Sequence, residues 1–254
     1  MDIIASRQNP VFKELFKLKQ RKYRLARGVF LAEGERLVRD ALEAGWRPLQ
    51  LIVTQGQEFD LGGSYVYITE QLMSALSETR SPQGVIGVFQ HPGRRLEELA
   101  IKEGLVLVLD GLQDPGNAGT LLRSAAAAGV TGVIGLAGTV ELTNPKVVRA
   151  SMGGIFRTAW VEAVAREAFL DWARQQKLSL LQLEPRNGMP FHHYDYNHSP
   201  LGLVVGSETG GISAQVSAAC SGALTIPMPG GSESLNAAMA ATLVLWQALI
   251  ARGL

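Results

Sequence analysis

The segment at residues 104–110 constrains the fold more than any other part of this sequence. It is an almost unbroken apolar run that ends at Asp110 and leads into a glycine-rich turn. A strand without polar alternation is typical of a parallel sheet that is buried on both faces. Further strands are expected at 132–136, 178–183, 201–206 and 223–227, with helices at 117–128 and 234–251. This alternation of strands and helices predicts an α/β fold with an open parallel sheet.

The first ninety residues show a separate pattern of short strands and helices. We expect strands at 29–32, 49–54, 64–68 and 84–89, and helices at 9–27, 36–44 and 70–77. The chain breakers and charges at 91–95 are typical of a linker. A length of 254 residues is also enough for two domains. We therefore predict a small α/β domain over 1–90, a linker over 91–103 and a second domain over 104–254.

Positive charge is concentrated at the amino-terminal end of the chain. Residues 1–27 hold eight lysines and arginines and two acidic residues, whereas the net charge of the whole chain is only +1. Such an asymmetry indicates that this end contacts a polyanion. In the basic helix expected at 9–27, the spacing of Phe12 and Phe16 predicts that both rings face the core.

Composition excludes several other classes of protein. A single cysteine, Cys220, cannot form an internal disulfide framework or a cysteine-based zinc site. No run of about 18 uncharged apolar residues indicates a membrane span, and the first residues do not have the pattern of a signal peptide. The four histidines are not spaced as a metal site. We therefore expect a cytoplasmic protein that uses no metal and contacts no membrane.

Three glycine-rich turns follow expected strands and hold the polar residues that are best suited to chemistry. The turns and their candidate residues are 110–123 with Asn117 and Arg123, 204–213 with Glu208, and 226–238 with Ser234 and Asn236. Each turn also has a plain structural interpretation, because asparagine and serine cap helices and a lone glutamate in a loop is usually solvated. None of the turns is a P-loop or a dinucleotide-binding fingerprint. Because parallel sheets bind ligands where strands lead into helices, we expect the three turns to converge on one site.

Together the three turns resemble the motifs of a known enzyme family. In chain order they read Asn-x-Gly-x-x-x-Arg, then Gly-Ser-Glu-x-x-Gly-Ile-Ser, then Ile-Pro-Met-x-Gly with Ser-Leu-Asn. This order closely resembles the SpoU (TrmH-type) RNA ribose 2′-O-methyltransferases of the SPOUT superfamily. Segments 6–10, 30–34 and 81–84 are similar to the substrate-binding domain, itself similar to ribosomal protein L30e, that many members carry. The resemblance covers the whole chain and implies a trefoil-knotted α/β domain preceded by a small L30e-like α/β domain.

The resemblance also implies a cofactor, a substrate and roles for individual residues. S-adenosylmethionine would be the methyl donor, no metal would be needed, and the protein would be a homodimer. The residues that would line the cofactor pocket are Gly206, Ile226, Met228 and Leu235. By the resemblance, Arg123 would activate a ribose 2′-hydroxyl, either as a base or as an electrostatic stabiliser. Because a guanidinium keeps its charge, our hypothesis is that Arg123 mainly stabilises the alkoxide that develops there. The residues that would orient and support this centre are Asn117, Glu208, Ser234 and Asn236.

RNA contacts are expected from the basic amino-terminal part, since Lys and Arg bind phosphates. The candidates are Arg7, Lys22, Arg24 and Arg36. The accessory domain favours structured ribosomal RNA as the substrate. Three alternatives stay open: a transfer RNA 2′-O-methyltransferase, a non-catalytic RNA-binding protein on the same fold, and a nucleotide-binding enzyme that acts on a small molecule.

Overall fold

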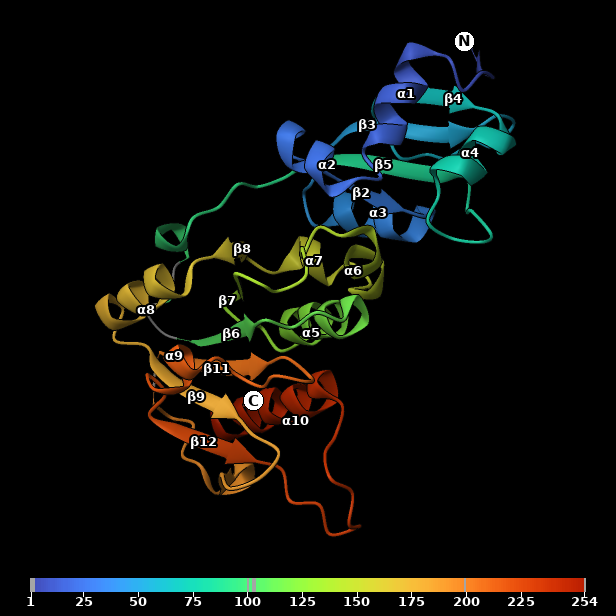
Figure 1. The fold of residues 1–254 in the computed structure, drawn as a ribbon. Coiled ribbons are helices and arrows are strands. Elements are labelled where there is room, and N and C mark those ends of the chain that lie inside the picture. The colour runs from blue at the N-terminus through green and yellow to red at the C-terminus, as the bar shows by residue number, and fades with distance from the viewer. Residues whose placement is uncertain (1–2, 100, 102–103, 199, 254) are drawn as a thin grey trace.

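The computed structural model describes residues 3–99, 101, 104–198 and 200–253, and it contains two β-sheets (Figure 1). The first sheet has five strands in the order β1-β4-β3-β5-β2. Its strands and the helices between them are β1 (Ile3–Ile4), α1 (Pro10–Lys17), α2 (Arg21–Arg27), β2 (Val29–Glu33), α3 (Glu35–Glu43), β3 (Pro48–Thr54), β4 (Tyr65–Ile68), α4 (Glu70–Leu76) and β5 (Val85–Gln90). β5 pairs antiparallel with both β2 and β3, whereas β3, β4 and β1 are parallel.

Helices cover both faces of this first sheet. On one face, Phe12 of α1 and Leu72 of α4 pack in one core with Ile52 of β3. On the other face, Val38 of α3 packs with Phe30 of β2. This second core continues into the core of the larger sheet.

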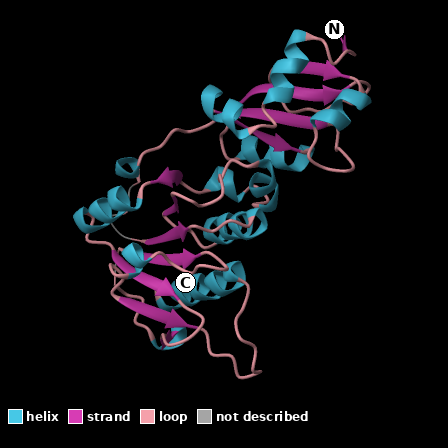
Figure 2. Cartoon of the chain, viewed as in Figure 1, coloured by secondary structure: helices cyan, strands magenta, loops and turns pink. Residues whose placement is uncertain are grey.

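The second sheet has seven strands in the order β10-β12-β9-β11-β6-β7-β8, and every adjacent pair is parallel (Figure 2). Its strands are β6 (Leu105–Asp110), β7 (Gly132–Leu136), β8 (Trp160–Val164), β9 (Ser179–Leu183), β10 (Met189–Pro190), β11 (Leu201–Gly206) and β12 (Gly222–Thr225). Its helices are α5 (Pro115–Ala127), α6 (Pro145–Ala150), α7 (Gly154–Arg157), α8 (Arg166–Gln175), α9 (Ala214–Ser217) and α10 (Ala237–Ala251), with 3₁₀ turns at Leu96–Glu98 and Phe191–His193. The prediction of an α/β fold with a parallel sheet is confirmed.

The apolar run of β6 is explained by cores on both sides of the sheet. Leu107 and Leu109 pack in the core that includes α5 and α10. Val106 and Val108 point the other way, into the core that includes α8. β6 and β11 are paired along their whole length, with Gly206 opposite Asp110, so both strands end at the same edge of the sheet.

Aromatic rings and ion pairs join the two sheets. The rings of Phe30 and Phe156 stack with centroids 5.9 Å apart, and the Trp46 indole donates a 2.9 Å hydrogen bond to the Phe156 carbonyl. Arg24 of α2 forms a bidentate ion pair with Glu141, at 2.6 and 3.1 Å, and both side chains are only 3% exposed. The amino-terminal sheet is therefore fixed directly against the segment around α6 and α7.

The prediction of one basic helix at 9–27, with Phe12 and Phe16 both facing the core, is wrong in two respects. The helix is divided, because α1 ends at Lys17 and α2 begins only at Arg21. Phe12 is buried, as expected, but the Phe16 ring is 43% exposed. The turn between α1 and α2 redirects the chain, and Phe12 and Leu15 occupy the buried face of α1 in place of Phe16.

Part of the predicted linker is packed against the protein. Leu96, Leu99 and Ile101 are buried in the core that includes α8. Residues 100, 102 and 103 of this segment lie outside the described residues. The boundaries at 90 and 104 and the trefoil knot stay predictions.

Candidate active site

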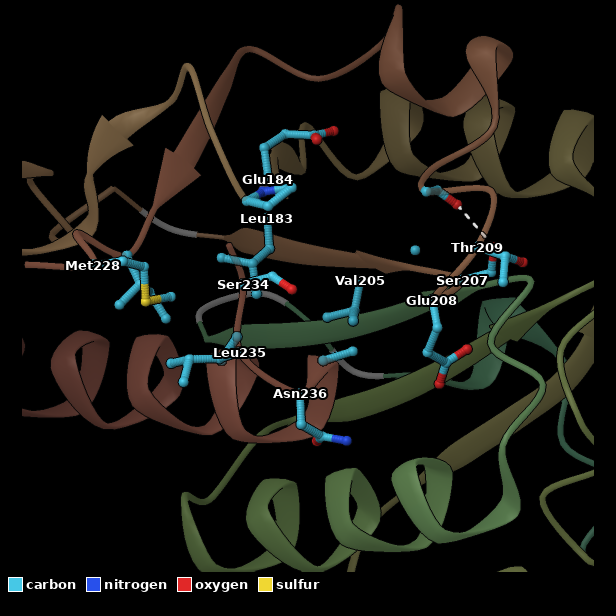
Figure 3. A pocket seen from close by; sticks show the side chains of 16 residues that line it. Leu183, Glu184, Val205, Ser207, Glu208, Thr209, Met228, Ser234, Leu235 and Asn236 are labelled. Carbon is cyan, nitrogen blue, oxygen red and sulfur yellow. Dashed lines mark hydrogen bonds between the residues drawn. The ribbon is translucent and has the colours of Figure 1, made fainter. Parts of the chain in front are cut away.

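A pocket of about 550 Å³ opens at the carboxyl edge of the parallel sheet, where β9, β11 and β12 end and α10 begins (Figure 3). This edge is where ligands bind in open parallel sheets. The volume of the pocket is typical of sites for small molecules and cofactors. The lining residues are Leu183, Glu184, Pro185, Val205, Gly206, Ser207, Glu208, Thr209, Gly211, Ile226, Met228, Ser234, Leu235, Asn236, Ala237 and Ala240.

The second glycine-rich turn folds back on itself at one wall of the pocket. The backbone groups of Ser207 and Gly211 exchange two hydrogen bonds of 3.0 Å. A Cβ atom at Gly206 would lie 2.3 Å from the Gly211 carbonyl carbon and 2.5 Å from the Ile212 nitrogen. Real Cβ atoms do not approach backbone that closely, so this turn requires glycine at 206.

A buried carboxylate anchors the far end of the same turn. The Asp110 side chain is fully buried and accepts hydrogen bonds from the Ser213 backbone N–H at 2.8 Å and the Ser213 hydroxyl at 2.6 Å. Arg166 forms an ion pair with the other Asp110 oxygen at 2.6 Å. A buried charge needs such partners to offset the loss of water. Asp110 thereby ties the turn at 207–213 to the end of β6.

A chain of three side chains joins the three predicted turns. Asn236 is the N-cap of α10, and its carbonyl oxygen accepts from the backbone N–H groups of Ala238 and Met239. Its amide nitrogen therefore faces outward and donates to the Asn117 oxygen at 2.8 Å. The Asn117 nitrogen in turn donates to the Glu208 carboxylate at 2.6 Å. The helix cap thus fixes the orientation of both amides and sets the Glu208 carboxylate at the pocket wall.

The structure brings together most of the predicted catalytic residues, but not all of them. Glu208, Ser234 and Asn236 line the pocket, and Asn117 is bonded to two of them. Arg123 is exposed on α5, and within the described part of the chain its side chain forms no hydrogen bond or ion pair. At 100° per residue, Arg123 projects about 120° away from Asn117 around the helix axis and lies about 9 Å further along it. Within one chain, Arg123 does not line the pocket.

The four predicted cofactor residues, Gly206, Ile226, Met228 and Leu235, all line this one pocket. Sequence reasoning missed Glu184, whose backbone is held to β12 by a 2.9 Å hydrogen bond to the Leu224 carbonyl. Its position directly after the apolar strand β9 is the signal that could have found it, because that strand ends at the same edge. Figure 3 shows the Glu184 side chain among those that line the pocket.

The predicted RNA contacts fall into two groups. Arg7, Lys22 and Arg36 are exposed. The prediction for Arg24 is wrong, because its guanidinium is buried, paired with Glu141 and bonded to the carbonyls of Leu18 and Lys19. Arg24 therefore joins the two sheets and has no free donor face for a phosphate.

Two further features concern metals and membranes. Within residues 3–99, 101, 104–198 and 200–253, no group of three or more His, Cys, Asp or Glu side chains is arranged to hold a metal ion. None of the helices in the described segments has the length and apolar character needed to cross a membrane.

Comparisons with known proteins identify both parts of the chain. Residues 104–246 match the model of the SpoU rRNA Methylase family, and residues 9–87 match the MRM3-like substrate binding domain. The 23S rRNA (guanosine(2553)-2′-O)-methyltransferase RlmP of Bacillus subtilis is 31% identical over 97% of this chain and 98% of its own length.

Solved structures agree with these matches. An AdoMet-bound rRNA methyltransferase from Sinorhizobium meliloti superposes with a TM-score of 0.88 at 30% identity, covering 97% of each chain. The SpoU methyltransferase AviRb from Streptomyces viridochromogenes, in complex with AdoMet, gives a TM-score of 0.89 at 27% identity over 96% of this chain and 98% of its own. The chain therefore belongs to the SpoU rRNA methylase family.

Proposed function

We propose that this protein transfers a methyl group from S-adenosylmethionine to a ribose 2′-hydroxyl of ribosomal RNA. The observation that carries this proposal is the convergence of the second and third glycine-rich turns on one pocket, with Asn117 of the first turn hydrogen-bonded to a lining residue of each. The activities in the names of the relatives from Bacillus subtilis and Sinorhizobium meliloti support the reaction and the class of RNA.

The pocket residues fit S-adenosylmethionine by their chemistry. An apolar wall that includes Val205, Ile226 and Leu235 suits a flat adenine ring, and glycine at 206 allows the turn beside that wall to fold back closely. Glu184 and Glu208 are also among the lining residues, and their negative charge suits a ligand that carries positive charge. When bound, S-adenosylmethionine supplies an electrophilic methyl group on a sulfonium centre.

The chain's own residues have to activate and orient the hydroxyl. A neutral hydroxyl is a weak nucleophile, so the site must stabilise the negative charge that develops on its oxygen. Arg123 performs this role as a permanent cation with free donors. Asn117 and Asn236 orient the ribose, Ser234 supports them, and Glu208 holds the Asn117 amide in one orientation.

We further propose a homodimer in which Arg123 serves the pocket of the partner chain. α10 exposes Met239, Leu243, Trp246 and Ile250 at helical spacing, which forms one apolar face. An exposed apolar face of this kind is typical of a protein–protein interface. α10 also packs on α5, which carries Arg123, so a second copy on this face lies next to the exposed guanidinium.

Mixing two impaired variants, at a concentration of S-adenosylmethionine too low for the Gly206→Ala pocket to bind it, tests this arrangement. Arg123→Ala removes the activating cation, and Gly206→Ala disturbs the cofactor pocket. If Arg123 acts across the dimer, each mixed dimer has one intact site, so random mixing restores about a quarter of the wild-type sites. If Arg123 acts within its own chain, mixing restores no activity.

The proposed reaction is tested by methyl transfer from labelled S-adenosylmethionine to ribosomal RNA and, in parallel, to transfer RNA. Arg123→Ala should abolish transfer and leave cofactor affinity near that of the wild type. Arg174→Ala is the matched control, because Arg174 is also an exposed arginine on a helix, α8, beside the other face of the sheet. Transfer by Arg123→Ala at the wild-type rate contradicts the role of Arg123, and a wild-type protein that binds no S-adenosylmethionine contradicts the whole proposal.

Two finer points belong to the same proposal. The amino-terminal sheet binds the RNA, and the exposed cations Arg7, Lys22 and Arg36 support this role. The protein acts in the cytoplasm, which is supported by the chain having only one cysteine, Cys220.

A further inference from the structure

A second, smaller pocket of about 150 Å³ lies between the two sheets, and we call it the intersheet pocket. From the amino-terminal side it is lined by residues that include Arg36 and Asp40 of α3, Ser81 and Gln83. From the other side it is lined by Arg149 of α6 and by Met152. It is thus formed by residues from both parts of the chain.

The acidic side chains of the intersheet pocket already have hydrogen-bond or ion-pair partners of their own. The Glu33 carboxylate accepts from the hydroxyls of Ser77 and Thr79 and from the Glu78 backbone N–H. Asp40 forms an ion pair with Arg157 at 3.2 Å.

The two guanidiniums of the pocket have no such partners. Arg36 and Arg149 make no side-chain hydrogen bond or ion pair to any residue that the structure describes. The pocket therefore presents two unpaired positive charges beside two carboxylates that are each held by donors of their own.

Arg149 carries the most direct sign of a missing ligand. Its Nη1 atom is buried and has no hydrogen-bond partner within the described residues. A buried donor left without a partner is costly, and nearly all such groups in proteins are satisfied. A guanidinium has planar paired donors that match the oxygens of a phosphate. An anion that enters the pocket would satisfy Arg149 and would meet Arg36 at the same time.

The position of the pocket connects it to Arg123. The turn from α6 to α7 runs through Met152 and Gly153, both at positive φ, with Met152 exposed. On one side of this turn, a Cβ atom at Gly153 would lie 2.8 Å from the Asp40 Cβ. On the other side, a Cβ atom at Gly154 would lie 2.8 Å from the Arg123 Cα. Only residues 152–154 separate the wall of the pocket from the backbone of Arg123.

We propose that the intersheet pocket binds a backbone phosphate of the RNA substrate through Arg36 and Arg149. The inference rests on the proposed function, which makes RNA the substrate and Arg123 the group that meets its ribose. A phosphate held here fixes the RNA strand at a set distance from Arg123. It also links binding by the amino-terminal sheet to correct placement of the reacting ribose.

The test measures RNA affinity of Arg36→Gln, Arg149→Gln and the double variant over a series of salt concentrations. Each single variant should weaken RNA binding about tenfold at moderate salt and reduce the slope of log affinity against log salt by about one. The fold-loss of RNA affinity in the double variant should be smaller than the product of the two single fold-losses, since both residues contact one phosphate. Arg39→Gln is the matched control, because Arg39 is exposed on the same helix, pairs with Glu35 and does not line the pocket.

Two additional measurements keep the outcome specific. The melting temperature of Arg149→Gln should equal or exceed that of the wild type, because the variant removes an unsatisfied buried donor. A fall in melting temperature with unchanged RNA affinity indicates a structural role and overturns the proposal. A second outcome also overturns the proposal: millimolar inorganic phosphate raises the melting temperature of the wild type, and Arg149→Gln abolishes this effect but binds RNA as the wild type does. The ligand of the pocket is then a free anion.

Failure of this inference is distinguishable from failure of the proposed function. If Arg36→Gln and Arg149→Gln bind RNA as the wild type does while methyl transfer continues, only the phosphate pocket is refuted. If the wild type neither binds S-adenosylmethionine nor methylates RNA, the proposed function is refuted. Weakened RNA binding by the two variants would in that case still support the phosphate pocket.

Discussion

Replacing Gly206 by alanine tests most directly how the cofactor pocket is built. Gly206 ends β11 and faces the turn that folds back over it. A Cβ atom there would lie 2.3–2.5 Å from the backbone atoms of Gly211 and Ile212. These are main-chain atoms in a hydrogen-bonded turn, so no side chain can rotate away to relieve the contact. The turn itself has to move.

The size of the effect follows from this contact. Overpacking a well-packed site costs about 1–3 kcal/mol. If the turn stays in place, the strain lowers the free energy of unfolding, and a chain of this size loses about 2–4 °C of melting temperature per kcal/mol. If the turn shifts, the protein without ligand is not strained, but the cofactor has to bring the turn back to its place in order to bind. The affinity for S-adenosylmethionine then falls by about 5- to 150-fold. The loss of unfolding free energy and the loss of binding free energy together should therefore amount to about 1–3 kcal/mol.

Calorimetric titration with S-adenosylmethionine and thermal unfolding without ligand measure the two contributions separately. Gly222→Ala is the matched control, since Gly222 is also a strand glycine of the same sheet and its Cβ atom would lie an ordinary 3.5 Å from Leu181. We expect the control to bind and unfold like the wild type. The reasoning is refuted if Gly206→Ala changes neither affinity nor melting temperature by more than the control does.

The remaining predictions concern four other features of the chain. Glu141→Gln leaves Arg24 buried beside a neutral partner, so the free energy of unfolding in urea should fall by about 3 kcal/mol, and unchanged stability would contradict a structural role for this pair. Asn117→Ala breaks the link between Asn236 and Glu208 and should lower kcat/KM for methyl transfer about tenfold or more at an unchanged fold. Trp246→Glu puts a charge on the apolar face of α10 and should convert dimers to monomers in sedimentation experiments; a dimer that persists refutes that interface. Burial raises the pKa of the Cys220 thiol to about 12, so alkylation at pH 8 should be at least about 100-fold slower in the folded protein than in urea, and its rate should keep rising beyond pH 9.

The parts of the fold that could be predicted are those whose cause is local in the sequence. β6 and β11 are recognisable because burial on both faces leaves no polar position before Asp110 at the end of β6 and none in β11. Asn236 is recognisable as a helix cap by its place before an apolar helix, although that helix begins at Ala237, three residues later than expected. The residues of the pocket follow from the resemblance of the three turns, and the structure brings them to one edge because the strands before them are parallel.

The parts that could not be predicted depend on contacts between distant residues. Arg24 lies in a run of cations that predicts an exposed face, but its partner Glu141 is 117 residues away and no periodicity points to it. Phe16 has core spacing on a continuous helix, and it is exposed because the chain turns after Lys17. Glu184 lies in a segment without any motif. Its place directly after an apolar strand indicates the sheet edge, but the pairing of β9 with β12, which brings it to the pocket, cannot be read from the sequence.

The distribution of charge is consistent with the proposed role of Arg123 as an activating cation that lies apart from the pocket of its own chain. Glu184 and Glu208 are among the residues that line the pocket. The guanidiniums of Arg36, Arg149 and Arg123, which have no partner among the described residues, lie outside it on α3, α6 and α5. A guanidinium placed beside a sulfonium would repel it, and a carboxylate placed along the path of a phosphate backbone would repel the RNA. The two ligands of the proposed reaction have opposite charges, and the fold gives each its own surface. These surfaces have to meet only at the reacting oxygen and methyl group, and an arginine supplied from a neighbouring chain satisfies this condition better than one fixed inside the pocket.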